Sequence, residues 1–164
     1  MRSSMMFFVC LFTITGCSPN SPSFKEMKIF YEENRAVFDE VSEFSCKLGE
    51  DGRLSTYLNS SDYETTTQRI DKLDALMVKV NGRAIWYTSN TDGSCSLSIE
   101  IYRNHFANNG RAFYYNYNLD SIFPYDKTKH TEEKIIESKR DMRFDMSLSD
   151  SDAKLKWYFT YTYS

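Results

Sequence analysis

Two histidines are the residues of this sequence best suited to acid–base or metal chemistry. His105 lies beside Asn104 in a segment that we predict to be a turn, and His130 lies in a charged stretch from residue 126 to 134. Neither has a neighbouring serine or cysteine that could serve as a nucleophile. The sequence also lacks a Gly-x-Ser-x-Gly elbow, a glycine-rich phosphate loop and a His-Glu-x-x-His motif. We therefore predict two exposed loop histidines, no catalytic residues and a protein that is not an enzyme.

Acidic residues near two predicted turns are the candidates for a calcium site. Asp150 and Asp152 flank Ser151, and Asp92 precedes Gly93. Neither segment has the alternating oxygen ligands and distal glutamate of a calcium-binding loop. Aspartate is also common in turns because its side chain bonds to nearby backbone N–H groups. We predict turns at both places, with no metal and no cofactor.

Three tyrosines are candidates for a binding surface. Tyr114 and Tyr158 fall opposite the apolar series of their predicted strands, and Tyr102 ends its strand. On an uncovered sheet face such rings could bind a partner protein or a sugar, because tyrosine offers contact area at little entropic cost. Cross-strand packing of the rings within the sheet is the favoured alternative.

The first sixteen residues have the pattern of a secretory signal peptide. Arg2 supplies a positive charge, and an apolar run follows from residue 5 to 12. That run is shorter than the roughly 20 residues that a membrane-spanning helix needs. We predict that residues 1–16 are removed.

The residues around the predicted cleavage site, Ile14-Thr15-Gly16-Cys17, resemble a bacterial lipobox. The resemblance implies that Cys17 is acylated and anchors the mature protein to a membrane. Ser18 stands where an aspartate would favour inner-membrane retention, so the resemblance implies the periplasmic leaflet of the outer membrane. Residues 17–22 then form a lipidated tether, whose polar part, residues 18–22, reaches at most about 17 Å.

The lipobox resemblance also bears on the remaining cysteines. Cys10 lies in the predicted signal peptide and Cys17 would carry lipid, which leaves Cys46 and Cys95. Disulfides persist in the oxidising envelope, so we predict one between this pair. A redox or metal site is the weaker alternative, because the pair is not a Cys-x-x-Cys motif.

Length and composition indicate one folded domain over residues 23–164. Aromatic residues are 16% of the 164-residue chain, which argues against disorder. The formal net charge is −3 with no basic stripe, so we expect no nucleic-acid partner.

Helical periodicity predicts two helices in the first half of this domain. The first spans residues 23–48, with a capping box at Ser23 and Glu26, one polar break at Asn34 and Gly49 as its end. The second starts near Ser61 and stops at Asn81-Gly82. That dipeptide could instead turn a hairpin.

Alternating apolar and polar residues predict strands in the second half. These strands cover residues 84–89, 95–101, 113–117, 142–148 and 155–163, and a short extended piece is expected at 54–58. The order of elements predicts an α+β fold, with two helices on one face of a four- to five-stranded antiparallel sheet. Residues 119–139 remain as a long connection with a possible helical turn at 131–139.

The ordered set of motifs resembles a group of small, uncharacterised lipoproteins of Gram-negative bacteria. The matching segments are residues 30–38, 69–77, 85–87, 110–115 and 157–159, which include Asn34-Arg35 and Ile85-Trp86-Tyr87. The resemblance implies a membrane-tethered domain and supplies no catalytic residues. The chain is more polar than this group between residues 120 and 139.

The leading hypothesis is a non-enzymatic envelope lipoprotein that binds another envelope protein through its sheet face or the 119–139 connection. An inhibitor or immunity protein against a lytic enzyme is a specific form of it. The alternative is a small-ligand binding protein that holds a glycan or lipid, for example between the helices and the sheet.

Overall fold

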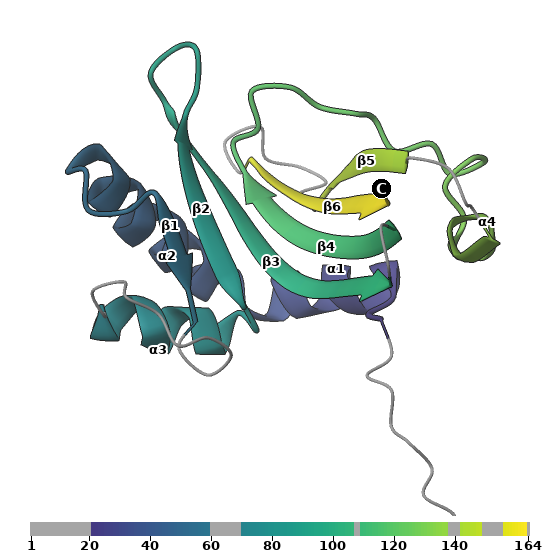
Figure 1. Ribbon diagram of the computed structural model, residues 1–164, viewed down its shortest axis with the longest axis horizontal. Helices are drawn as coiled ribbons and strands as arrows, with labels where there is room; N and C mark the ends of the chain where they lie inside the picture. The colour runs from purple at the N-terminus through teal and green to yellow at the C-terminus, as the bar shows by residue number, and fades with distance from the viewer. Residues whose placement is uncertain (1–20, 60–69, 107–108, 138–141, 149–155, 164) are drawn as a thin grey trace, which may run out of the picture.

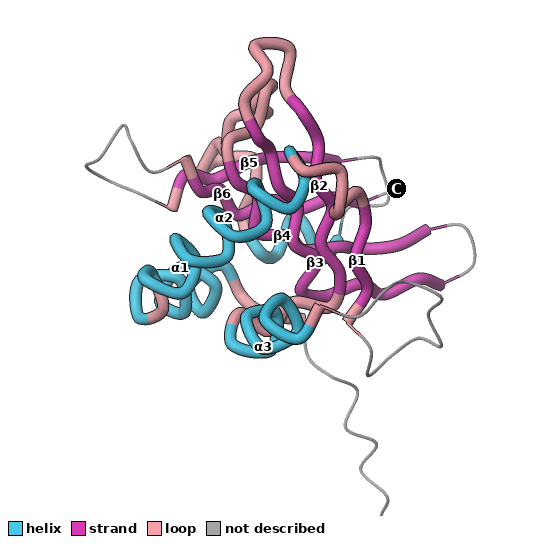
Figure 2. The backbone as a smooth tube through the Cα atoms, turned by 90° about the vertical axis from the view of Figure 1, so that its left-hand side faces the viewer, coloured by secondary structure: helices cyan, strands magenta, loops and turns pink. Residues whose placement is uncertain are grey.

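The fold is α+β, with helices on one face of an antiparallel sheet (Figure 1). A computed structural model describes residues 21–59, 70–106, 109–137, 142–148 and 156–163. Its helices are α1 (Phe24–Glu33), α2 (Arg35–Glu50), α3 (Asp71–Lys79) and the short α4 (Glu132–Glu137). Figure 2 shows α1, α2 and α3 together on one side of the strands. Among the described residues, none of the helices is long and apolar enough to cross a membrane.

The predicted single helix over residues 23–48 is wrong in one respect, because the chain breaks at Asn34 into α1 and α2. Asn34 has φ −114° and ψ 17°, and its side-chain Nδ2 donates to the Phe30 carbonyl at 2.8 Å. An asparagine side chain competes in this way with the helical backbone bonds. The capping box at Ser23 and Glu26 is present as predicted.

Gly49 does not end the helix as predicted, because α2 continues through it to Glu50. A Cβ on Gly49 would lie 2.1 Å from Cδ2 of Tyr87, so this position allows α2 to approach the sheet closely. The stop at Asn81-Gly82 is confirmed, since α3 ends at Lys79 and Asn81 adopts φ 55°. The predicted start near Ser61 lies outside the described residues.

The sheet has six strands rather than four to five. They are β1 (Thr56–Leu58), β2 (Ala84–Ser89), β3 (Cys95–Phe106), β4 (Asn109–Tyr117), β5 (Met142–Ser147) and β6 (Trp157–Tyr163). Their order is β1-β2-β3-β4-β6-β5, and every neighbouring pair is antiparallel. The extended piece at residues 54–58 supplies the additional edge strand.

A β-bulge changes the pattern of β3 halfway along the strand. Glu100 pairs with Tyr114, but the next pairing joins Tyr102 to Phe113, so Ile101 is the extra residue. A bulge of this kind interrupts the strict alternation of side chains. The consequence is that Tyr102 turns to the helix side, where its ring lies 5.6 Å from that of Phe113.

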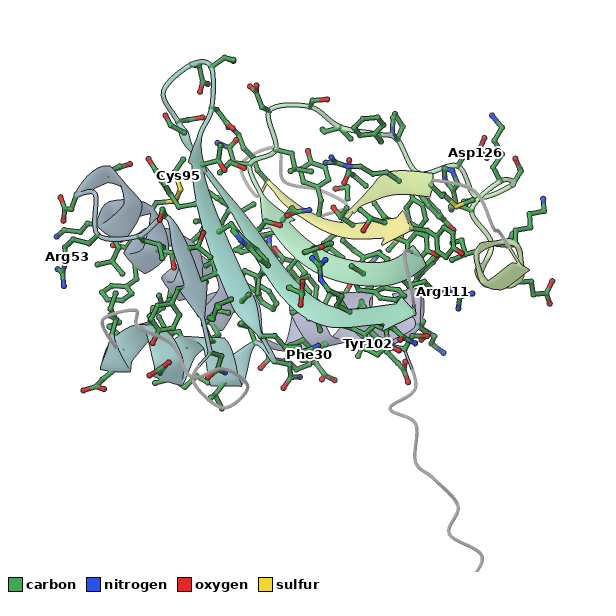
Figure 3. All side chains as sticks on the ribbon, viewed as in Figure 1. Phe30, Arg53, Cys95, Tyr102, Arg111 and Asp126 are labelled. Atoms are coloured by element: carbon green, nitrogen blue, oxygen red, sulfur yellow. A yellow bond between two sulfur atoms is a disulfide. The ribbon has the colours of Figure 1, made fainter. Side chains whose placement is uncertain are left out.

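Aromatic side chains fill the layer between helices and sheet. The ring of Phe38 in α2 lies 4.7 Å from Tyr115 and 5.1 Å from Trp157, measured between centroids. The predicted disulfide joins Cys46 of α2 to Cys95 of β3, with the Cα atoms 5.6 Å apart (Figure 3). The helix layer is therefore fixed to the sheet by packing and by a covalent bond.

Candidate functional site

Polar side chains cover the sheet face that turns away from α1, α2 and α3. Alternation along each strand places the apolar residues on the helix side and these polar residues on the other. They line a cleft of about 500 Å³, which we call the sheet-face cleft. Its strand residues are Trp86 and Thr88 of β2, Ser96, Leu97, Ser98 and Arg103 of β3, Tyr114 and Asn116 of β4, Arg143 of β5, and Thr160 and Thr162 of β6.

Two aromatic rings stand together in the sheet-face cleft. Trp86 and Tyr114 are half-buried, and their ring centroids are 6.3 Å apart in an edge-to-face arrangement. Trp86 is on β2 and Tyr114 is on β4, and their rings meet across the intervening strand β3. The pair offers an apolar surface within a polar cleft.

Arg103 fixes the position of the Tyr114 hydroxyl. Its Nη2 donates to Tyr114 Oη and its Nε donates to Glu100 Oε2, each at 2.5 Å. Burial raises the pKa of Tyr114, and the charge of Glu100 adds to this increase while that of Arg103 opposes it. The phenol therefore stays protonated, and the guanidinium charge is balanced by a carboxylate.

A chain of buried hydrogen bonds runs across the floor of the cleft. Asn116 Nδ2 donates to Thr160 Oγ1, which in turn donates to Asp145 Oδ1, each at 2.5 Å. The three residues are at most 4% exposed. Asn116 Oδ1 is buried and has no hydrogen-bond partner among the described residues. A buried acceptor without a partner is uncommon in folded proteins and calls for a functional or solvent explanation.

The chain after β4 forms one wall of the cleft through residues 119–121. This wall is tied to the β2–β3 turn, where Thr91 Oγ1 donates to Asp120 Oδ1 at 3.0 Å and Asn90 Nδ2 to the Asn118 carbonyl at 2.8 Å. Further along, the Phe123 N–H donates to Asp145 Oδ2 at 2.8 Å. The segment that follows β4 is thus attached to the β2–β3 turn and to strand β5.

Arg143 is the second cation of the cleft. It lies 3.8 Å from Asp145 Oδ2 and stacks over the Phe123 ring at 4.7 Å. Like Arg103, it has a carboxylate close by.

The structure does not bring the three predicted tyrosines together. Tyr114 lines the sheet-face cleft, and Tyr158 lies on the same face without lining it. Tyr102 packs against the core on the opposite face because of the bulge. Tyr158 is half-buried and lies opposite both Asn116 and Ser147 in the sheet register.

Of the two histidines, His130 does not line the sheet-face cleft. His105 is in strand β3, opposite Gly110, and not in the predicted turn. His130 is partly buried in the 119–131 connection, where its ring stacks on Phe144 at 4.6 Å. His130 Nδ1 accepts the Asp126 N–H at 2.9 Å, and Figure 3 labels Asp126 on this connection.

Turn chemistry accounts for Asp92, whose Oδ1 accepts the Ser94 N–H at 2.8 Å. Hydrogen bonds from the side chain and the backbone of Ser94 lower the pKa of Asp92. Over the part of the chain that the structure describes, no three His, Cys, Asp or Glu residues are grouped to hold a metal ion. Asp150, Asp152 and Cys17 lie outside the described residues.

A second hollow, of about 480 Å³, lies at the margin of the helix layer. It is lined mainly by apolar residues of α1 and β3, including Met27, Ile29, Phe30 and Ile101. Glu26 and Glu33 also border it. Its place beside α1 and β3 is similar to that of the predicted site for a glycan or lipid between the helices and the sheet.

Sequence reasoning missed most residues of the sheet-face cleft. Asn116, Thr160 and Arg143 occupy the polar positions of predicted strands, so alternation alone could have placed them on one face. Arg103 could not be placed, because the bulge that directs it to this face has no clear sequence signal.

Comparisons with protein-family models, with curated proteins and with solved structures gave no match to this chain. The structure therefore defines the class of this protein: it is an α+β protein whose sheet has helices on one face and a polar cleft on the other.

Proposed function

We propose that this chain is a non-enzymatic, lipid-anchored binding protein of the bacterial envelope that holds a small polar ligand in the sheet-face cleft. The observation that carries the proposal is the cleft itself, with its paired rings and buried polar floor. Its volume of about 500 Å³ lies within the range of small-molecule sites, roughly 300–1,000 Å³. A few fixed polar groups beside aromatic side chains are also typical of such sites.

The charged groups of the cleft support binding rather than catalysis. Arg103 is held by Glu100 and by the Tyr114 hydroxyl, and Arg143 lies beside Asp145. Each cation therefore has a positioning role in the fold. The lipid anchor rests on the resemblance of Ile14 to Cys17 to a lipobox.

Native mass spectrometry of the full chain, purified in detergent from envelopes, tests the binding function. We expect a retained small ligand on the wild type and on Tyr158→Ala, and its loss from Tyr114→Ala. Tyr158 is a matched control because it lies on the same face outside the cleft. Absence of any ligand from the wild type, or equal retention by both variants, would contradict the proposal.

Membrane fractionation of Cys17→Ala tests the anchor separately. The variant should appear in the soluble periplasmic fraction, because a removed acyl chain leaves no other predicted attachment. If Cys17→Ala still pellets with membranes, this result would contradict lipid anchoring. It would not bear on ligand binding in the sheet-face cleft.

A protein partner is a second candidate, favoured by exposed apolar residues beside the cleft. Ile122 and Phe123, which directly follow the wall residues 119–121, are 45% and 47% exposed. An inhibitor or immunity role against a lytic enzyme belongs to this candidate. It predicts that Phe123→Ala weakens a protein complex while small-ligand retention is unchanged.

A further inference from the structure

We infer that the ligand of the sheet-face cleft is a neutral saccharide, an inference that rests on the proposed function and specifies its ligand class. Three independent properties of the cleft support this: the balance of its charges, its pair of rings and the orientation of Asn116.

The charge balance disfavours an anionic ligand. Both arginines of the cleft have a carboxylate neighbour, Glu100 for Arg103 and Asp145 for Arg143. Asp120 adds a negative charge to the wall. The positive charges of the two arginines are therefore already offset by carboxylates, which weakens their attraction for a phosphate or carboxylate, whereas a neutral ligand does not depend on that attraction.

The rings of Trp86 and Tyr114 suit a ligand with both an apolar and a polar side. A sugar ring presents C–H groups on one face and hydroxyl groups around its edge. The rings are 6.3 Å apart, and Arg103 holds the Tyr114 hydroxyl in place. The C–H face of a sugar can therefore pack on rings whose orientation is already fixed.

The hydrogen-bond chain on the floor determines what Asn116 can bind. A carboxylate only accepts hydrogen bonds, so the Thr160 hydroxyl must donate its proton to Asp145. Thr160 Oγ1 then accepts from Asn116, which fixes Nδ2 toward Thr160. The free atom of the amide is consequently Oδ1, an acceptor that needs a donor. Oδ1 is covered in the ligand-free structure, so a ligand reaches it only after a small movement of the side chains around it. A sugar hydroxyl then supplies a donor, and an ionised phosphate or carboxylate does not.

Tryptophan fluorescence of the full chain in detergent micelles can detect binding directly. The chain has two tryptophans, of which Trp86 lines the cleft and Trp157 is fully buried in the core. The probes are maltotriose and chitotriose as neutral sugars, trigalacturonate as an anionic sugar and Gly-Ala as a non-sugar polar ligand. Isothermal titration calorimetry gives the affinity of each variant.

We expect one or both neutral sugars to shift the Trp86 emission, with trigalacturonate and Gly-Ala at least tenfold weaker. Tyr114→Ala and Asn116→Ala should each weaken binding about tenfold or more, and Tyr158→Ala should change it less than twofold. Trp86→Phe should remove most of the fluorescence change while calorimetry still detects binding. Circular dichroism of each variant verifies that it is folded.

Stronger binding of trigalacturonate in the cleft would overturn the neutral charge of the inferred ligand, and stronger binding of Gly-Ala would overturn its saccharide class. The proposed binding function stands in either case. Sugar binding that is equally weakened by Tyr158→Ala and Tyr114→Ala would place the sugar outside the cleft and also overturn the inference. If no probe binds the wild type, the inference fails, and ligand retention in native mass spectrometry decides whether the binding function fails with it.

Discussion

Phe38 is the residue around which the aromatic core is arranged. Its side chain is fully buried, and its ring contacts those of Tyr31, Tyr115 and Trp157 at centroid distances of 5.1, 4.7 and 5.1 Å. These partners come from α1, β4 and β6. Loss of this one ring therefore affects the contacts of helices and sheet alike.

We predict that Phe38→Ala lowers the free energy of unfolding by about 3–5 kcal/mol, because it removes buried surface and leaves a cavity. Urea unfolding followed by circular dichroism measures the change. The control is Val78→Ala in α3, which is 64% exposed and should change stability by less than about 0.5 kcal/mol. Similar losses for the two variants would contradict the central role of Phe38.

At the scale of elements, the connection between β4 and α4 is held by local hydrogen bonds and ring stacking. His130 stacks on Phe144 with an interplanar angle of 14° and accepts the Asp126 N–H through Nδ1. Hydrogen bonds from Thr128 hold the pKa of Asp126 at about 2. Burial lowers the pKa of His130, although the negative charge of Asp126 opposes this effect and that of Lys129 adds to it.

Acidification should therefore loosen this connection. Protonation of His130 converts Nδ1 from an acceptor to a donor and ends the bond from Asp126. Since the folded-state pKa is lowered from 6.5, the contribution of His130 to stability is present above pH 6.5 and is lost as the pH falls through the folded-state pKa. Melting curves from pH 7.5 to 5 should show a fall in Tm over the acidic part of this range.

The matched variant is His130→Phe, which keeps a ring on Phe144 and does not titrate. It should reduce the fall in Tm between pH 6.5 and 5. An unchanged pH profile in His130→Phe would assign the effect to other groups.

At the scale of the whole molecule, the disulfide joins positions 49 residues apart and links the helix layer to the sheet. A crosslink of this length restricts the unfolded chain and so stabilises the folded state. The chain-entropy model gives about 4 kcal/mol for a closed loop of this size.

We predict that the Cys46→Ser/Cys95→Ser double variant loses up to about 4 kcal/mol of stability while the α+β fold is retained. Chemical denaturation measures the loss. Dithiothreitol should reduce the stability of the wild type by a similar amount and leave the double variant unchanged. An equal effect of dithiothreitol on both proteins would contradict this role of the disulfide.

Much of the fold follows from local patterns in the sequence. Three features were predictable: the capping box at Ser23, the stop at Asn81-Gly82 and the alternating strands. Each depends on residues that are only a few positions apart in the sequence. The break at Asn34 was less predictable, since its neighbours continue the helical period on both sides. The prediction that Gly49 ends the helix was wrong. A glycine is needed there because α2 lies against Tyr87, which is distant in sequence.

The candidate site was only partly predictable. Alternation put Tyr114 on the polar face of its strand, and the structure places it in the sheet-face cleft. Tyr102 was grouped with it because the pattern of β3 contains no sign of the bulge. Pairing of β6 between β4 and β5, which brings Thr160 between Asn116 and Asp145, depends on long-range contacts.

The sequence by itself determined the capping box at Ser23, the helix stop at Asn81-Gly82, the strand periods and the α+β class, because these depend on short-range geometry and on which residues avoid water. Only the tertiary structure decided that Arg103, Tyr114, Asn116 and Thr160 share one cleft and that Tyr102 does not. The physical reason is that strand order and a bulge determine which side chains meet, and both result from pairing between distant segments.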